Sequence, residues 1–402
     1  MSPTLIERNI IVLAFVSFFN DIASEATLRL LPLFLSQVLG TSTAAIGLIE
    51  GVAESTATLT KLLSGWVSDH MARRKPLVLA GYSFSGLTKP LLLIANSWPW
   101  VLFIRFADRV GKGVRAAPRD ALVADEAHSS KRGHSFGLNR ALDNAGAIVG
   151  LFIAYVVVAN SETLTREQFH TVVKIAIIPA TLAVLLLAFG VKERARKISP
   201  APAAAAGKNP IFGPRPRLPR EFWRYMLVLG AFTLSNSSDA FLVLKAAHAK
   251  NGIGFVLLCL MALNISGAVL AVPAGKLSDR IGRKKLIITG WLVYATAYAG
   301  FAVTSSSGSL MALFFFYGAF YGFAEGVERS FIADLVPLGS GRGYAYGVFN
   351  FVVGVMSFPA SLLFGLAMAH WGERTSFFAD AAIAAVATIG LVFFVPEKKR
   401  YA

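Results

Sequence analysis

Residues Gly65–Lys75 read GWVSDHMARRK, and 210 residues later Gly275–Lys285 read GKLSDRIGRKK. Gly, Asp, Arg and Lys stand at matching places in the two copies. Two further landmarks return in nearly the same register, because Arg132-Gly133 recurs as Arg342-Gly343 and Gly113 recurs as Gly322. A repeat at about half the chain length indicates a protein built from two homologous halves.

The composition places both halves in a lipid bilayer. Hydrophobic residues make up 55% of the 402 residues and the mean hydropathy is +0.59, while only 15% are charged, against about 25% in soluble domains. Apolar runs such as 171–190 and 379–395 are long enough to cross the hydrocarbon core. No signal-peptide pattern opens the chain, so we expect the first hydrophobic run to be retained.

The hydrophobic pattern predicts an all-α membrane protein with twelve transmembrane helices. We expect them near 9–38, 45–66, 77–97, 98–120, 136–159, 169–190, 222–247, 253–274, 285–305, 309–335, 343–369 and 374–396. Two pseudo-symmetric six-helix halves, 1–190 and 222–402, then flank a central segment, 191–221. This segment is rich in Pro, Ala and basic residues, so it reads as a linker that cannot bury a core.

The net charge of +16 could suggest a nucleic-acid partner, but the positions of the basic residues argue against it. Most loop Lys and Arg fall in alternate loops, which is the positive-inside pattern of a multi-pass membrane protein. Both termini and the linker are therefore predicted to be cytoplasmic, in the cytoplasmic (inner or plasma) membrane. The basic linker sets this orientation, and binding of anionic headgroups stays open as a second role.

The loop motif in both halves, with this topology, resembles the major facilitator superfamily across nearly the whole chain. Arg109 and Gly113 also resemble the Arg-to-Gly spacing of that family's fourth helix. The resemblance implies that the repeated loop latches the two halves in the outward-facing state. The latch residues it implies are Gly65, Asp69, Arg73, Gly275, Asp279 and Arg283. The first copy departs from the pattern, because Ala72 stands where the second has Gly282.

Several charged residues fall inside predicted helices. At 1.5 Å per residue, Arg109 lies about 13 Å below the outer edge of its helix, close to the bilayer midplane. Asp21 and Glu25 share one face of the first helix, and Glu54 lies near the midplane on the second. Charges at this depth must face a cavity or a partner. We therefore expect Asp21, Glu25, Glu54 and Arg109 to couple transport to protons.

Other polar residues in the predicted helices are expected to line a substrate cavity. They are Asn20, Glu50, Lys89, Lys112, Asp143, Asn144, Asn236, Asp239, Tyr321, Glu325 and Asn350. Most of the charged ones belong to the first half. We therefore expect the first half to handle charge and the second to form a gate and an apolar wall.

These features predict a secondary transporter that moves a small organic solute by alternating access. A carboxylate whose surroundings change between the two sides can load and release a proton. Export by proton antiport is the first choice, from the two acids of helix 1 and the Arg109 motif. Proton- or ion-coupled uptake of a polar or anionic solute is the alternative, since Lys89, Arg109 and Lys112 suggest an anionic group.

Other protein classes lack support in the sequence. No phosphate-binding GxxxxGK[ST] loop is present, so we expect no nucleotide. Cys259 is the single cysteine and the six histidines are scattered, so we expect no metal site and no cofactor besides the proton. No nucleophile and base are apparent for an enzyme. A non-transporting receptor remains a minor alternative, and the protein is expected to be a monomer with a small-molecule partner.

Overall fold

The computed structural model describes residues 3–69, 71–126, 132–193, 218–249, 252–336 and 342–396. Most of the predicted linker, 194–217, lies outside these residues. The described part is helical, and no strand occurs in it. The helices are α1 (Pro3–Leu28), α2 (Leu31–Leu33), α3 (Thr43–Asp69), α4 (Lys75–Leu91), α5 (Trp98–Glu126), α6 (Arg132–Val158), α7 (Arg166–Gly190), α8 (Arg220–Ser235), α9 (Ala240–His248), α10 (Gly252–Ile281), α11 (Arg283–Val303), α12 (Ser307–Leu335) and α13 (Arg342–Phe394).

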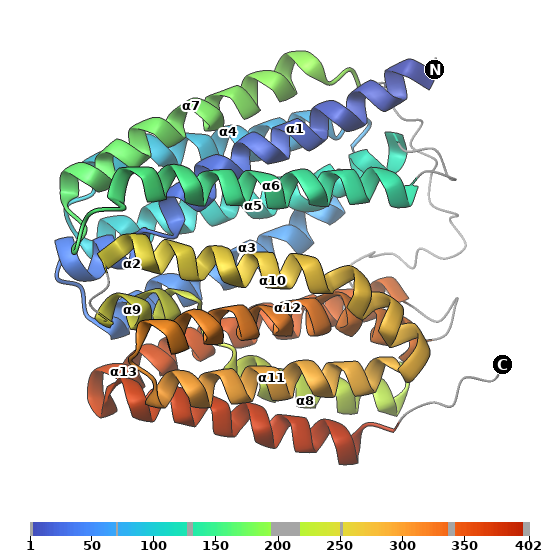
Figure 1. Ribbon diagram of the computed structural model, residues 1–402. Helices are drawn as coiled ribbons and strands as arrows, with labels where there is room; N and C mark the ends of the chain where they lie inside the picture. The colour runs from blue at the N-terminus through green and yellow to red at the C-terminus, as the bar shows by residue number, and fades with distance from the viewer. Residues whose placement is uncertain are drawn as a thin grey trace.

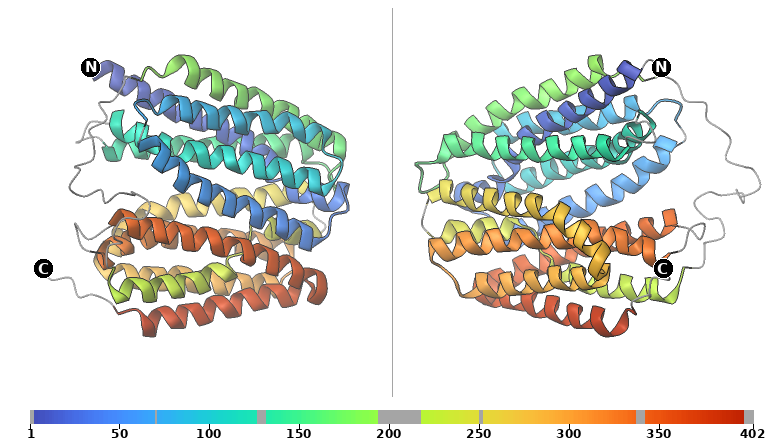
Figure 2. Two further views of the ribbon diagram at one scale, coloured as in Figure 1. Left: turned by 180° about the vertical axis from the view of Figure 1, so that it is seen from behind. Right: turned by 45° about the vertical axis from the view of Figure 1, so that its right-hand side comes forward.

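The helices form two bundles, one from each half of the chain. Figure 1 shows α1 to α7 above and α8 to α13 below, and the views of Figure 2 keep the same separation. Where the bundles meet, α3 packs along α13 and α6 along α10. Helix α1 begins and α13 ends at the same end of the molecule.

The first helix of each half is broken, which the sequence did not predict. Helix α1 ends at Leu28, and the chain continues through α2 into a short π-helix, Phe34–Val38. In the second half, α8 ends at Ser235 and α9 starts at Ala240. Conversely, the two helices predicted for 343–369 and 374–396 follow each other directly. They are separated by Gly372, whose φ of 82° interrupts α13 and suits a residue without a side chain.

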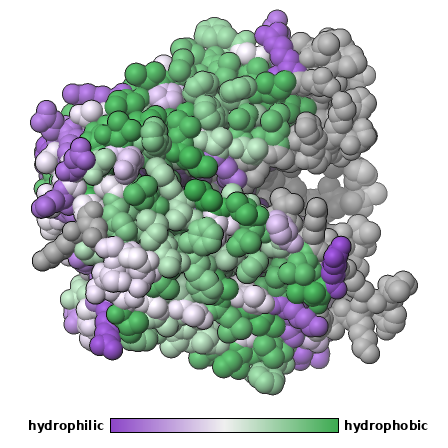
Figure 3. All heavy atoms as spheres, viewed as in Figure 1, coloured by the Kyte–Doolittle hydropathy of each residue, from purple (hydrophilic) through white to green (hydrophobic). Residues whose placement is uncertain are grey.

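The sides of the bundle are apolar enough for a bilayer. Nine of the described helical stretches are long and apolar enough to cross a membrane. Exposed Leu, Ile, Val and Phe side chains lie along them, for example Leu87, Phe189 and Leu227. Figure 3 shows hydrophobic side chains over the sides of the helices, with hydrophilic ones toward the left-hand and right-hand ends. The protein is therefore an integral, multi-pass membrane protein.

The repeated loop forms a tighter turn in the second half. Helix α10 ends at Ile281 and α11 starts at Arg283, so Gly282 alone makes the turn, with φ at 101°. In the first half, α3 ends at Asp69 and α4 does not start until Lys75. An L-residue rarely adopts the backbone of Gly282. The longer first turn fits the Ala72 found in place of that glycine.

The two halves are joined at the end where α2 and α9 lie. Thr43 donates a hydrogen bond to the carbonyl of Gly365 (3.1 Å). The amide of Ile253 donates to the carbonyl of Ser161 (2.9 Å). At the opposite end, a side chain added at Gly275 or Gly347 would meet nothing within 4 Å. The halves thus meet closely at the end where α2 and α9 lie.

Candidate functional site

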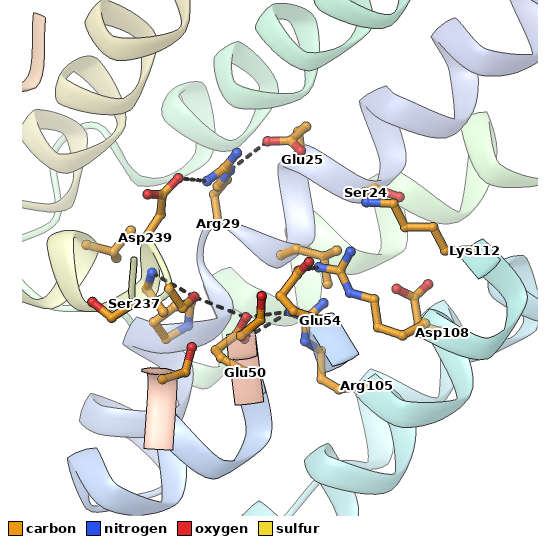
Figure 4. Close-up of a pocket in the computed structure, with 18 of the residues that line it drawn as sticks. Ser24, Glu25, Arg29, Glu50, Glu54, Arg105, Asp108, Lys112, Ser237 and Asp239 are labelled. Carbon is orange, nitrogen blue, oxygen red and sulfur yellow. Dashed lines mark hydrogen bonds and ion pairs between the residues drawn. The ribbon is translucent and has the colours of Figure 1, made fainter. Parts of the chain in front are cut away.

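A cavity of about 350 Å³ lies between the two halves. Its wall comes from α1, α3 and α5 on one side, and from the α8–α9 break, α12 and α13 on the other (Figure 4). The charged lining residues are Asp21, Glu25, Arg29, Glu50, Glu54, Arg105, Asp108, Arg109, Lys112, Arg115 and Asp239. Except for Asp239, all of these belong to the first half.

Helix α5 carries four of the five cations of the wall at three- and four-residue spacing, which places them on one face. Nη2 of Arg105 donates to both carboxylate oxygens of Glu50 of α3, at 2.9 and 2.8 Å. Only 2% of Arg105 and 6% of Glu50 is exposed. Two buried charges of this kind stabilise the fold only as a pair.

One turn further along α5, Arg109 pairs with Glu54 at 3.1 Å. The Arg109 side chain is 9% exposed, whereas 45% of the Glu54 side chain is exposed. Glu54 therefore lies at the accessible surface of the cavity and holds a buried guanidinium.

Asp108 is held from behind by α4. Lys89 lies 3.2 Å from its Oδ1, and the hydroxyl of Ser85 donates to the same oxygen at 2.5 Å. Lys89 is buried and does not line the cavity. Lys89 neutralises the carboxylate of Asp108, which does line the cavity.

Arg29 connects the two halves. It lies in the break after α1, 2.7 Å from Glu25 of its own half and 3.5 Å from Asp239 of the other. Asp239 also accepts hydrogen bonds from the hydroxyls of Tyr321 (3.0 Å) and Tyr317 (3.3 Å) of α12. Figure 4 shows Arg29 between the two carboxylates. Arg29 and Asp239 are 210 residues apart, the spacing of the repeated loop.

Asp21 lines the cavity and accepts a hydrogen bond from Asn20 at 3.0 Å. Within the described part of the chain, no Lys or Arg nitrogen lies within 4.0 Å of its carboxylate. Asp21 thus differs from Glu25, Glu50 and Glu54, each of which is paired with an arginine.

The remaining predicted residues divide between the wall and its surroundings. Asn236 and Tyr321 line the cavity with Asp239. Asp143, Asn144 and Asn350 are not among its lining residues. Asp143 lies 3.9 Å from Arg119, and Asn350 donates to the carbonyl of Tyr346. The side chains of Glu325, Asp69 and Asp279 lie outside the described part of the structure.

The latch residues that are described make contacts within their own halves. A side chain added at Gly65 would meet Ala117 of α5 at 3.4 Å. Arg283 lies 2.8 Å from Asp334 at the end of α12, and Arg73 is exposed. A latch between the halves in the outward-facing state remains a prediction.

Sequence reasoning did not select Arg29, Arg105, Asp108 or Arg115 for the site. Three of these lie on the predicted fourth helix, and their depth within a membrane span was the available signal. For Arg29 the signal was its place four residues after Glu25, the spacing of an ion pair on one helix face. The break that points Arg29 toward the second half had no such signal.

Two helical bundles around a buried, charged cavity define a membrane transporter rather than an enzyme. The sequence profile described as the Major Facilitator Superfamily matches residues 13–269 and 245–402. The chain belongs to this superfamily, whose members are transporters and not enzymes.

Individual relatives agree with this assignment. An MFS-type transporter of Methanocaldococcus jannaschii is 34% identical over 371 residues, covering 90% of this chain and 88% of the relative. The multidrug resistance protein MdtG of Escherichia coli is 23% identical, covering 95% and 93%. The nucleoside transporter NupG superposes with a TM-score of 0.79 at 13% identity, covering 96% and 100%, which supports the fold.

Proposed function

We propose that this transporter moves a small organic solute by alternating access, with the proton as its coupling ion. The cavity lies between two halves that meet closely at one end. With loop 65–75 on the cytoplasmic side, the end where the halves meet closely lies on the outer side of the membrane. The transporter is then in an inward-facing state. Rocking of one half against the other would expose the same charges to the other side.

The observation that carries the proposal is the unpaired carboxylate of Asp21. Protonation of Glu50 or Glu54 would leave the buried Arg105 or Arg109 without its partner, which costs several kcal/mol. Protonation of Glu25 would break its ion pair with Arg29. Asp21 can take up and release a proton without breaking an ion pair. We therefore propose Asp21 as the coupling carboxylate. The charges of Glu25, Glu54 and Arg109 set the electrostatic potential around it.

The first form of the proposed function is export by antiport, in which solute and proton compete for binding in the cavity. It is supported by the two acids of α1, the Arg109 motif and the similarity to a multidrug resistance protein. The second candidate is uptake together with a proton. One observation favours it: Lys112 and Arg115 line the cavity and have no carboxylate within 4.0 Å among the described residues.

The test is a proton-flux measurement. Purified protein is reconstituted into liposomes that enclose the pH dye pyranine, and nucleosides, dipeptides, organic acids and cationic drugs are added outside in turn. We expect a solute-dependent pH change that is abolished in Asp21→Asn. Internal alkalinisation indicates antiport, and acidification indicates symport.

Glu167→Gln serves as the control, because Glu167 is exposed at the start of α7 and does not line the cavity. We expect this variant to keep the solute-dependent pH change. If Asp21→Asn transports the solute with unchanged dependence on the pH gradient, Asp21 is not the coupling group. If the wild-type protein transports a solute without any movement of protons, proton coupling itself is wrong.

A further inference from the structure

The cations of the cavity wall fall into two groups. Arg29, Arg105 and Arg109 each lie within 3.5 Å of a carboxylate oxygen. Lys112 and Arg115, on the same helix, have no such partner within 4.0 Å in the described part of the chain. The two are three residues apart on α5, so their side chains lie on one face of the helix.

The two unpaired cations are placed differently. The Arg115 guanidinium lies over the ring of Tyr82, 4.3 Å from its centroid, and the residue is 8% exposed. Stacking of this kind orients the guanidinium while its N–H groups stay available. Lys112 is exposed, lines the cavity and points from α5 toward α1 in Figure 4.

Buried donors next to this group also lack acceptors. Nε of Arg109, and both Nε and Nη1 of Arg105, have no hydrogen-bond partner among the described residues. Arg109 is 7% exposed and Arg105 is 2% exposed. A buried donor without an acceptor is costly, so an oxyanion placed here would recover that free energy. The face thus offers donors and unpaired positive charge together.

We infer that Lys112, Arg115 and the adjoining face of Arg109 form an anion-binding subsite, and that the solute carries a carboxylate or phosphate group. This inference rests on the proposed function, because it names the substrate class of the same cavity. The existing ion pairs stay intact when such a group binds. The cavity of about 350 Å³ lies at the small end of the range for ligand pockets, so the solute is small.

The facing acids connect this subsite to the proton. Glu54, Asp21 and Glu25 all act electrostatically on Lys112, and Glu25 is held by Arg29. Glu54 is already held by Arg109, whereas Asp21 is unpaired. A proton on Asp21 removes a negative charge opposite the bound anion, so proton and anion favour each other's binding. An acidic solute would therefore favour the uptake form of the proposed function.

The test uses Ser24→Cys, which places a thiol in the wall of the same cavity. The native Cys259 is fully buried, and its background is measured in the unsubstituted protein. The purified full chain is labelled with anionic methanethiosulfonate ethylsulfonate and with its cationic trimethylammonium counterpart. We expect the ratio of anionic to cationic labelling rates to fall about three- to tenfold when Lys112→Gln removes one nearby charge.

Protection from labelling measures binding directly. Phenyl phosphate and benzoate should slow labelling of Ser24→Cys at concentrations where benzamide does not. Lys112→Gln and Arg115→Gln should each weaken that protection about tenfold, as expected for loss of one charged hydrogen bond. Lys61→Gln is the matched control, because Lys61 lies on α3 but does not line the cavity. Protection that is equal for benzamide, or unchanged in Lys112→Gln, overturns the inference.

A lipid headgroup is the other source of the same chemistry. Labelling is therefore repeated in nanodiscs of phosphatidylcholine with and without phosphatidylglycerol. Slower labelling caused by phosphatidylglycerol alone would assign the subsite to lipid and overturn the proposal. Since these measurements involve no flux, loss of anion binding with intact proton-coupled transport rejects only the subsite. Anion binding without any proton flux rejects only the coupling.

Discussion

Helices α5 and α12 occupy equivalent places in the two halves but carry different side chains at the positions where α5 lines the cavity. Gly113 of α5 recurs as Gly322 of α12, 209 residues later. In the same register, Arg105 of α5 corresponds to Phe314 of α12, Asp108 to Tyr317 and Lys112 to Tyr321.

The comparison separates what the shared fold requires from what the site requires. Both helices keep a glycine where a neighbouring helix approaches closely, α3 in one half and α10 in the other. The side chains are free to diverge. Arg105 and Asp108 of α5 are held by ion pairs, whereas the side chains of α12 are held by ring packing, such as Tyr317 stacked on Phe320 at 5.8 Å.

The largest expected effect follows from removing one charge of α5. Arg105→Met leaves Glu50 buried and uncompensated, so we expect a loss of about 3–5 kcal/mol in the free energy of unfolding. The equivalent change in the second half, Phe314→Met, should cost only about 1 kcal/mol. Denaturation of both variants in detergent measures the difference.

The double variant Glu50→Gln/Arg105→Met controls for the ion pair. It removes both charges, so we expect it to recover most of the stability lost in Arg105→Met. Equal losses in Arg105→Met and Phe314→Met would show that α5 depends on its charges no more than α12 depends on its rings.

The next effect tests what the two helices share. A Cβ at Gly113 would lie 2.5 Å from the Thr60 Cβ and 2.8 Å from the Ala57 oxygen, and one at Gly322 would lie 2.8 Å from the Leu270 Cβ. We expect Gly113→Ala and Gly322→Ala each to lose about 1–3 kcal/mol. Gly347→Ala, with no atom within 4 Å, should be neutral or stabilising in the same unfolding assay. If only one of Gly113→Ala and Gly322→Ala is destabilised, the two helices do not share a requirement for close packing at this glycine.

The third effect concerns the contact between the halves. Asp239→Asn weakens the ion pair with Arg29 and should shift the population toward the outward-facing state, by about 1–2 kcal/mol. Spin labels at Glu162 and Ser305, both exposed in turns at the closed end, should then report longer distances. Asp239→Glu, which keeps the negative charge opposite Arg29, should retain the wild-type distances if the charges act on each other. Unchanged distances in Asp239→Asn would show that the pair does not hold this end closed.

The smallest effect comes from the tyrosines of α12. Tyr321 contacts both oxygens of Asp239, at 3.0 and 3.1 Å, whereas Tyr317 reaches one at 3.3 Å. We expect Tyr321→Phe to cost about 1 kcal/mol and Tyr317→Phe less, as ordinary hydrogen bonds contribute. The same spin-label distances and the unfolding midpoint measure both. A larger effect from Tyr317→Phe would reverse the roles given to the two hydroxyls.

The sequence predicted the membrane-embedded, all-helical class because hydrophobic length and the repeat are one-dimensional signals. It also led to much of the charged wall, since Glu25, Glu54 and Arg109 lie deep within predicted spans. It did not predict that Lys89 lies behind Asp108, because that depends on how α4 rotates about its own axis against α5. The Arg29–Asp239 contact was missed for a similar reason, since both residues lie at helix breaks that periodicity does not reveal.

The contact between Arg29 and Asp239 bears on how the molecule arose. The two residues occupy equivalent positions of the repeat and face each other across the junction of the halves. In an assembly of two identical half-length chains, a residue at this place would meet its own copy, and two arginines or two aspartates would repel. Opposite charges at this position require two halves of different sequence. The contact therefore belongs to the period after gene duplication, when the halves could no longer substitute for each other.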